Sequence, residues 1–373
     1  MRIGLNLLHA MPEIGGAWNY IASIIQGIGE YDAANTYIAY VTKKSEPLLL
    51  EANRIVPVQI DIDPVIRARR VVYENTRLQV LARKHKLNCM HWFANTQALV
   101  NAVPSVVTIY DIQAFRNLHE WSLIKRTYLR WMTKNSVRRA PVLLPMSHAT
   151  ARDLERLLHG DPSRMTIIPF ILRKGFHRAK DDEVDSFRKR FNLPDRFWVY
   201  VAHFYPHKNH RGLLEAFHKL KEDGFSPWPL VLRGDDCGEE ATVRKTIREM
   251  RLENQVIFLP RLAERELPIL YSAATALVFP SLYEGGGIPV VEALACGCPV
   301  IAADIPTTRE YASAAATYFD PRDPSSIARA IANFQEHEIL RNTHRRAGLA
   351  RAKEFEGERI ISKLLEAYAR ASS

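Results

Sequence analysis

The sequence of 373 residues has few cysteines and no long apolar segment. Its four cysteines form no C-x-x-C pair, which argues against a zinc site and predicts reduced thiols that are mostly buried. No run of about 18 apolar residues occurs, so no transmembrane helix is expected. The N-terminal residues lack the basic stretch of a signal peptide and predict a first strand instead. Together these features predict a cytoplasmic protein without a bound metal.

Several motifs of common enzyme classes are also missing. There is no G-x-G-x-x-G after the first strand pattern, which argues against a nicotinamide-binding Rossmann site. The absence of G-x-x-x-x-G-K-[ST] argues against a P-loop NTPase, and the absence of G-x-S-x-G argues against an α/β-hydrolase. No acidic pair is placed to hold a divalent cation, because Asp235 and Asp236 fall in a predicted loop.

The chain is too long for one ordinary hydrophobic core and predicts two domains. Its content of 47% hydrophobic and 25% charged residues is typical of a soluble globular protein. Strand and helix patterns alternate in both halves, which predicts α/β domains with two doubly wound parallel sheets. In such sheets ligands bind beyond the carboxyl ends of the strands, here expected in a cleft between the domains.

The net charge of +10 is uneven along the chain. Residues 1–172 carry 21 basic and 13 acidic residues, whereas the remainder carries 30 and 28. A basic first half fits nucleic acid, an anionic membrane or a phosphorylated acceptor, or is a scattered solubilising charge. No RRM, KH or similar motif is present, which argues against nucleic acid.

Two helices are predicted to carry much of this basic charge. One covers Ile66 to Lys86. The other covers Trp121 to Arg139 and repeats basic residues every four positions, at Arg126, Arg130, Lys134 and Arg138. A basic stripe beside aromatic residues suits anionic lipid headgroups, and a solvated basic face is the equal alternative.

The most informative stretch is a glycine loop between two buried strands. The apolar run Ala276 to Phe279 predicts a strand, and Gly285, Gly286 and Gly287 follow it. Pro289 suits the first turn of a helix predicted over Val290 to Cys296, with Gly297 at its C′ position. The next strand is expected over 299–302. A helix that starts after glycines presents free N–H groups and a partial positive charge, which suit a phosphate.

Two carboxylates frame this loop, Glu284 before the glycines and Glu292 one turn into the helix. Glu292 lies among apolar residues, so an ionised carboxylate there needs a hydrogen-bonding partner. One interpretation is that Glu292 only favours the positive helix end and caps a neighbour. The other is a ligand with hydroxyl groups on both sides of a diphosphate, which is the shape of a nucleotide sugar.

The run EGGGIPVVE resembles the E-x7-E signature of retaining GT-B glycosyltransferases, the group called glycosyltransferase family four. The resemblance covers nearly the whole chain and is strongest from Phe197 to Pro321. It implies the GT-B fold: an acceptor-binding Rossmann-like domain over 1–172, a nucleotide-sugar-binding one over 173–355, and a C-terminal helix over 356–373 that packs back on the first domain. Gly286 stands where the family usually has phenylalanine, which implies a differently shaped sugar side of the pocket.

Three further motifs fit the same family. In AHFYPHKNH, Lys208 and Asn209 match its K-N pair, and His203 stands where another variant has arginine. The family often has the Gly15-Gly16 pair, which implies an approach to the donor diphosphate or the acceptor.

In VVTIYD, Asp111 keeps its place while Tyr110 stands where the family has a histidine thought to face the transferred sugar. Tyr110 either donates a hydrogen bond to the same sugar hydroxyl or is a strand-end core residue with its hydroxyl in solvent.

The resemblance implies roles for these residues. Lys208 and N–H groups from Gly285 to Ile288 stabilise the leaving diphosphate, so no metal is needed. Glu292 holds the ribose hydroxyls and Glu284 those of the donor hexose. The expected catalytic residues are Glu284, Lys208, Asp111 and Tyr110. The expected donor-binding residues are Gly15, Gly16, His203, Lys208, Asn209, Glu284, Gly285, Gly286, Gly287, Ile288 and Glu292.

The expected activity is metal-independent retaining transfer of a hexose, mannose from GDP-mannose, in surface polysaccharide synthesis. The acceptor is a saccharide or a polyprenyl-diphosphate-linked saccharide at the inner face of the plasma membrane. One alternative is a GT-B-fold epimerase or phosphorylase, although no distinctive lysine for pyridoxal phosphate is present. Another is a nucleotide-sugar-binding protein without turnover.

Overall fold

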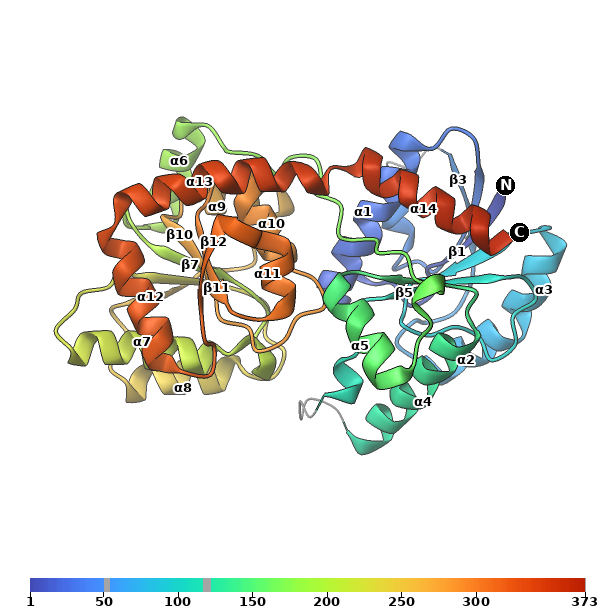
Figure 1. Ribbon diagram of the computed structural model, residues 1–373, viewed down its shortest axis with the longest axis horizontal. Helices are drawn as coiled ribbons and strands as arrows, with labels where there is room; N and C mark the ends of the chain where they lie inside the picture. The colour runs from blue at the N-terminus through green and yellow to red at the C-terminus, as the bar shows by residue number, and fades with distance from the viewer. Residues whose placement is uncertain (50–53, 117–121, 373) are drawn as a thin grey trace. The chain divides into compact units, whose positions relative to one another are not determined.

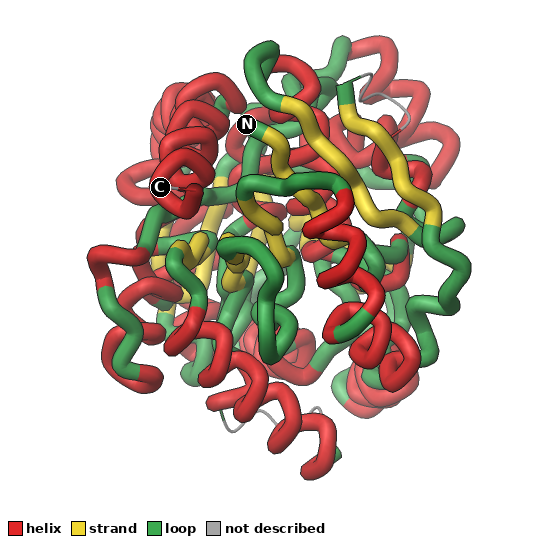
Figure 2. The backbone as a smooth tube through the Cα atoms, turned by 90° about the vertical axis from the view of Figure 1, so that its right-hand side faces the viewer, coloured by secondary structure: helices red, strands yellow, loops and turns green. Residues whose placement is uncertain are grey.

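The computed structural model describes residues 1–49, 54–116 and 122–372, and it divides into two units. Unit 1 comprises Met1–Ile171 and Glu356–Ser373, and unit 2 comprises Leu172–Phe355. Among the described residues, each unit contains one six-stranded sheet in which the paired strands are parallel. Helices pack around the strands in both units (Figures 1 and 2). The predicted α/β class with two doubly wound sheets is therefore confirmed.

Unit 1 alternates strands and helices, with short 3₁₀ turns between them. Its strands are β1 (Arg2–Asn6), β2 (Thr36–Val41), β3 (Ile55–Gln59), β4 (Cys89–Trp92), β5 (Ser105–Ile109) and β6 (Val142–Pro145). Its helices are α1 (Gly16–Tyr31), α2 (Arg67–Asn75), α3 (Arg77–Lys84), α4 (Leu123–Arg139), α5 (His148–Leu158) and α14 (Gly357–Ser372). The 3₁₀ turns are η1 (Pro12–Ile14), η2 (Glu46–Leu49), η3 (Gln113–Phe115) and η4 (Pro162–Arg164).

Unit 2 repeats the same alternation. Its strands are β7 (Trp198–Val201), β8 (Leu230–Arg233), β9 (Val256–Phe258), β10 (Ala276–Phe279), β11 (Val300–Ala303) and β12 (Ala316–Phe319). Its helices are α6 (Asp181–Phe191), α7 (His210–Glu222), α8 (Glu240–Glu249), α9 (Leu267–Ala273), α10 (Ile288–Ala295), α11 (Pro306–Ala312), α12 (Pro324–Glu336) and α13 (Glu338–Ala352). The 3₁₀ turns are η5 (Pro206–Lys208), η6 (Glu264–Glu266), η7 (Ser313–Ala315) and η8 (Lys353–Phe355).

The two sheets share one strand order. It is β3-β2-β1-β4-β5-β6 in unit 1 and β12-β11-β10-β7-β8-β9 in unit 2, so the first and fourth strands of each unit are neighbours at the centre. From such a central pair the chain connections leave in opposite directions, and a crevice opens at the carboxyl ends of the two strands. In unit 2 this pair is β7 and β10, and all four residues of β10 are buried.

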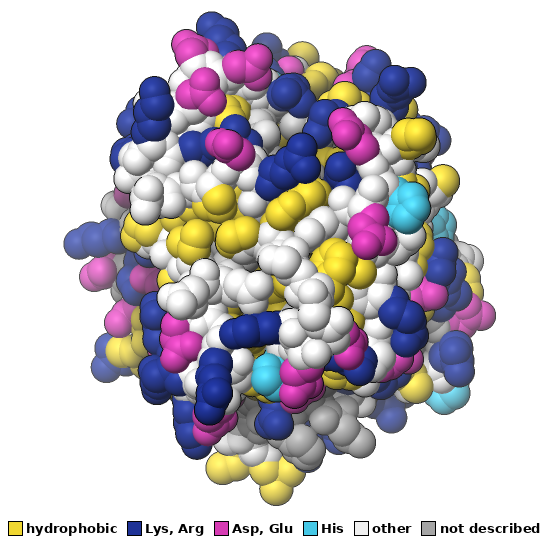
Figure 3. Space-filling model, turned by 90° about the vertical axis from the view of Figure 1, so that its left-hand side faces the viewer, with side chains coloured by type: hydrophobic (Ala, Val, Ile, Leu, Met, Phe, Trp, Pro, Cys, Tyr) yellow, Lys and Arg dark blue, Asp and Glu magenta, His cyan; other side chains and the backbone are white. Residues whose placement is uncertain are grey.

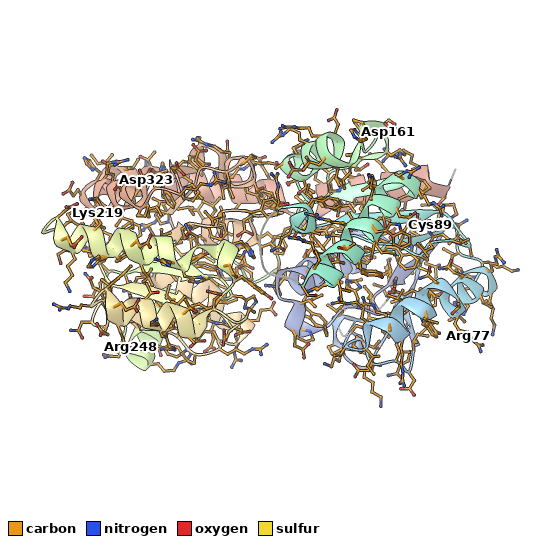
Figure 4. All side chains as sticks on the ribbon, turned by 90° about the horizontal axis from the view of Figure 1, so that it is seen from below. Arg77, Cys89, Asp161, Lys219, Arg248 and Asp323 are labelled. Carbon is orange, nitrogen blue, oxygen red and sulfur yellow. The ribbon has the colours of Figure 1, made fainter. Side chains whose placement is uncertain are left out.

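The terminal helix α14 packs within unit 1. The ring nitrogen Nδ1 of His91 on β4 lies 2.7 Å from the Tyr368 hydroxyl of α14. A Cβ atom added to Gly27 of α1 would lie 2.9 Å from the Ile361 side chain of α14, so a glycine allows the close approach of the two helices. Figure 1 shows α1 and α14 on the same unit, and Figure 4 shows Cys89 of β4 inside it. Cys89 is buried and unpaired, as are Cys296 and Cys298.

The prediction of one continuous helix from Ile66 to Lys86 is wrong. The chain breaks at Thr76, whose φ of −127° and ψ of −85° are not helical. The Thr76 hydroxyl donates to the Val72 carbonyl at 2.7 Å, and the Asn75 amide donates to the Val71 carbonyl at 2.8 Å. Such local side-chain bonds compete with helix continuation, which explains the break. In the other predicted basic helix, Trp121 lies outside the described residues, and α4 begins at Leu123.

Helix α11 and strand β12 are elements that the sequence patterns missed. The residues of β12 are Ala316, Thr317, Tyr318 and Phe319, and they pair in parallel with β11. A run of alanines precedes them, which favours helix and hides the short aromatic and β-branched strand signal.

Candidate active site

The loops that follow β7 and β10 meet at the centre of the unit 2 sheet. The Leu282 N–H in the loop after β10 donates to the His207 carbonyl in the loop after β7 at 2.8 Å. The Tyr200 hydroxyl at the end of β7 donates to the Lys208 carbonyl at 2.7 Å and lies 3.3 Å from the Ser281 hydroxyl. Both loops are thus tied together where a doubly wound sheet binds its ligand.

The glycine loop leads into α10 as the sequence predicted. Gly287 precedes the helix, and a Cβ atom there would lie 3.1 Å from the Cβ atom of Tyr311, so a larger residue would crowd α11. Helix α10 begins at Ile288, two residues earlier than expected, and Gly297 follows it with a φ of +68°. The start of α10 directs N–H groups and the positive end of the helix dipole at the loop. This arrangement suits a phosphate group.

Lys208 and Glu284 form an ion pair across the two loops. The Lys208 Nζ donates to Glu284 Oε1 at 2.7 Å, and the two side chains are only 17% and 9% exposed. The Glu284 carbonyl accepts a hydrogen bond from the Thr307 hydroxyl at 2.8 Å, which fixes the loop against α11. The predicted phosphate-binding lysine and the predicted sugar-binding carboxylate therefore lie side by side.

The Asn209 side chain connects the loop after β7 to the backbone of two other loops. Its amide nitrogen donates to the Pro280 carbonyl at 3.1 Å and to the Pro321 carbonyl at 2.8 Å. Its φ of +58° lies in the left-handed region, which asparagine tolerates better than most residues. In this structure the Asn209 side chain therefore supports the position of Lys208 through the backbone.

His203 lies at the carboxyl end of β7 with a side chain that is one third exposed. Its Nδ1 accepts a hydrogen bond from the Asp235 N–H at 3.1 Å. Burial lowers the pKa of His203, while the nearby Asp235 carboxylate opposes this shift. A neutral ring whose Nδ1 is an acceptor carries its proton on Nε2, so His203 presents a donor on the other side of the ring.

Glu292 is buried on α10 and has the partner that its apolar surroundings require. Its Oε1 accepts from the Arg173 guanidinium at 3.3 Å, and its Oε2 accepts from the Tyr271 hydroxyl at 3.3 Å. Burial raises the pKa of Glu292 to about 7, and the Arg173 charge holds it from rising further. Sequence patterns indicated that a partner was needed but did not identify Arg173, which lies 119 residues earlier.

The candidate residues of unit 1 lie at the start of α1 and directly after β5. Gly15 has a φ of +58° and caps α1, whose first residue is Gly16. Tyr110 follows β5 and packs edge-to-face on Tyr20, with ring centroids 5.4 Å apart. The Tyr110 hydroxyl is buried without a hydrogen-bond partner among the described residues, so the alternative of a solvent-exposed hydroxyl is wrong. Burial raises its pKa well above the usual value, and the hydroxyl therefore stays protonated.

Asp111 is fixed by a local turn. Its Oδ1 accepts from the Gln113 N–H at 2.8 Å, and its carbonyl accepts from the Asn95 amide at 3.1 Å. The same Asn95 side chain accepts from the Tyr110 N–H at 2.7 Å. Among the described residues, no cluster of three histidine, cysteine or acidic side chains is arranged to hold a metal ion.

Comparisons with known proteins give a consistent result. Residues 181–351 match the family model described as Glycosyl transferases group 1. The chain is 26% identical to O-antigen chain mannosyltransferase B of Escherichia coli over 265 residues, which are 71% of this chain and 70% of that protein. It is 29% identical to O-antigen chain mannosyltransferase RfbU of Salmonella typhimurium over 231 residues, which are 62% of this chain and 60% of RfbU.

Among solved structures, the fold matches that of Anabaena HepE in complex with UDP-glucose. The TM-score is 0.78 at 19% identity, and the match covers 99% of each chain. This likeness concerns the fold, and it confirms the predicted architecture of two Rossmann-like units.

Proposed function

We propose that this chain, whose residues 181–351 match the group 1 glycosyl transferase family model, moves a hexose from a nucleoside-diphosphate sugar to a glycan acceptor with retention of anomeric configuration. The observation that carries this proposal is the Lys208–Glu284 ion pair beside the glycine loop and the start of α10. This crevice combines a cation and helix N–H groups for a diphosphate with carboxylates for sugar hydroxyls.

When the donor binds, its diphosphate replaces Glu284 as the ion-pair partner of Lys208. The Lys208 ammonium and N–H groups at the start of α10 then stabilise the negative charge that develops on the leaving β-phosphate, which is the main electrostatic contribution. Glu284 is released at the same time, and its carboxylate accepts hydrogen bonds from the donor hexose. In this proposal the Lys208 ammonium and the N–H groups of α10 stabilise the leaving group without a metal ion.

Retention follows from attack on the same face as the leaving group. The acceptor hydroxyl bonds to the anomeric carbon as the bond from that carbon to the β-phosphate oxygen breaks. The acceptor proton passes to the departing phosphate oxygen, so the nucleoside diphosphate serves as the base.

The donor is GDP-mannose and the acceptor is a polyprenyl-diphosphate-linked saccharide. The names of the two O-antigen mannosyltransferases support mannose and a surface polysaccharide.

The exposed face of α4 supports contact with an anionic membrane. Ile124 and Trp131 are 84% and 56% exposed, and Lys134 and Arg138 are exposed on the same side of the helix. Only part of the predicted basic stripe is exposed. Arg126 and Arg130 are half-buried, and Arg130 donates to the Ala114 carbonyl at 2.6 Å. Apolar and basic side chains on one exposed face suit a headgroup region.

Unit 2 carries charges of both signs on the face at the left of Figure 1. Figure 3 shows basic and acidic side chains interspersed over this face, in contrast to the exposed face of α4. Among the described residues, no helix has both the length and the apolar character needed to cross a membrane.

A transfer assay tests the proposal. Purified protein is incubated with radiolabelled GDP-mannose, UDP-glucose or ADP-glucose and a bacterial lipid extract, with and without EDTA. The expected result is label in the lipid fraction from GDP-mannose alone, unaffected by EDTA. A protein that binds the donor but gives no labelled product with any of the three sugars would be the non-catalytic alternative.

A further inference from the structure

Arg173 is buried in unit 2 and contacts two acidic residues that the sequence places far apart. It is 7% exposed and lies in the extended segment before α6, the second residue of unit 2. One guanidinium nitrogen, Nη2, donates to Glu292 Oε1 at 3.3 Å, and the other, Nη1, donates to Glu264 on η6. The guanidinium also lies over the Phe176 ring, 5.2 Å from its centroid.

We propose that Arg173 is a positioning residue for the nucleoside: it holds the Glu292 carboxylate ionised and oriented so that this carboxylate accepts the two ribose hydroxyls. This inference rests on the proposed function, because it assigns Arg173 to the donor site through Glu292. Arg173 does not contact the ribose itself in this proposal; it acts on the ribose through the Glu292 carboxylate.

The first reason is charge. A carboxylate buried on the apolar helix α10 is strongly disfavoured unless a cation compensates it. The Tyr271 hydroxyl gives Glu292 one hydrogen bond but no charge. Arg173 supplies the compensating positive charge, because its guanidinium forms an ion pair with Glu292. Without Arg173, Glu292 becomes protonated at neutral pH. One of its oxygens then carries a proton and donates a hydrogen bond, whereas in the ionised form both oxygens accept.

The second reason is geometry. Arg173 Nη2 and the Tyr271 hydroxyl approach different oxygens of Glu292, which fixes the rotation of the carboxylate. A carboxylate has about four acceptor positions, so two remain for a pair of vicinal hydroxyls. The planar arginine fork bonds Glu292 and Glu264 at the same time, which the single ammonium of lysine does less well.

The third reason is that a purely structural role does not require these charges. A buried ion pair is often replaceable by apolar residues of similar volume without loss of stability. Glu264 is 64% exposed, so solvent alone can satisfy it. The guanidinium nevertheless links this exposed loop residue to the buried carboxylate of α10.

Ribose recognition is the measurement that separates the two roles. The nucleoside diphosphate that binds the wild type is titrated by calorimetry beside its 2′,3′-dideoxy form, and the ratio of the two affinities is recorded. The proteins are wild type, Arg173→Met, Arg173→Lys and the control Arg178→Met. Arg178 lies on the same segment, is half-exposed, and forms an ion pair with Asp181 at 3.8 Å.

The wild type and Arg178→Met are expected to prefer the ribose form by about 10- to 100-fold, the range for hydrogen bonds to a charged group. Arg173→Met should bind both forms within about threefold, and Arg173→Lys should recover part of the preference. If Arg173→Met fails to fold, Arg173→Lys decides alone, and its preference should still fall below that of the wild type.

Each outcome separates the inference from the proposed function. A folded Arg173 variant with an unchanged ribose preference would overturn the inference, as would a wild type that binds both forms equally. A wild type that binds no nucleoside diphosphate would instead overturn the proposed function itself.

Discussion

The Lys208 ammonium lies 2.7 Å from the Glu284 carboxylate, and this contact joins the loop after β7 to the glycine loop after β10. The two strands are neighbours at the point where the strand order of unit 2 reverses. The charges of the two residues therefore balance each other until a ligand with its own negative charge competes for the lysine. In the proposed function, a nucleoside-diphosphate sugar supplies that charge, and its hydroxyl groups donate hydrogen bonds to the Glu284 carboxylate.

Replacing Lys208 with alanine should reduce rate more than affinity. The ammonium acts on charge that develops as the diphosphate leaves, so kcat should fall by about 10²- to 10³-fold while KM changes less. Steady-state kinetics with the active donor measures both. The control is Lys219→Ala on α7, where the lysine is 44% exposed and pairs with Asp223 at 3.8 Å. Unchanged kcat/KM in Lys208→Ala would refute this role.

Nucleotide affinity should fall as the pH drops through about 7. The pKa of Glu292 is raised to about 7, chiefly by burial, and the groups facing it are Arg173, Tyr271, Glu264 and Cys296. Ribose hydroxyls donate to the ionised form, so binding is strongest above this pKa and weakens below it by up to about tenfold per pH unit. Calorimetric titrations from pH 5.5 to 8.5 measure the profile.

The nucleotide phosphate also titrates in part of this range, so a matched variant is needed. Glu292→Gln keeps the side-chain shape and removes the carboxyl group. The difference between the wild-type and Glu292→Gln profiles isolates the contribution of Glu292. Parallel profiles in the two proteins would mean that the Glu292 carboxylate does not contact the nucleotide.

Binding of the protein to anionic vesicles should depend on the exposed face of α4. Replacing Ile124 and Trp131 together with serine removes the exposed apolar side chains and should weaken binding to phosphatidylglycerol vesicles by about tenfold or more. Vesicle sedimentation measures the bound fraction. Ile339→Ser is the matched control, because Ile339 lies on α13 of unit 2 with the same 84% exposure as Ile124. Equal wild-type binding to phosphatidylcholine vesicles would contradict this role.

The fold was predictable because its main signals are local. The buried run over Ala276–Phe279 matches β10, and Gly297 ends the next helix with the positive φ that its position predicts. The break at Thr76 was not visible, because threonine and asparagine also occur within helices and only their bonds to backbone carbonyls end α2. Strand β12 was hidden by the alanines before it.

Local sequence patterns identify candidate site residues, whereas the contacts between these residues are seen only in the structure. The spacing of Glu284 and Glu292 around three glycines indicated a phosphate and two hydroxyl-binding carboxylates. The sequence could not show that Lys208 reaches Glu284 from another loop, or that Asn209 supports the loop through backbone carbonyls. Arg173 was missed because a pairing across 119 residues leaves no local pattern.

The most direct test is a calorimetric titration of GDP, UDP and ADP into the wild type and Glu292→Gln at pH 8 without added metal. The account predicts that one nucleotide, GDP, binds the wild type at micromolar strength, and that Glu292→Gln binds it at least about tenfold more weakly. Thermal melting of both proteins confirms that they are folded. Absence of binding by all three nucleotides, or equal binding by the wild type and Glu292→Gln, would contradict the account.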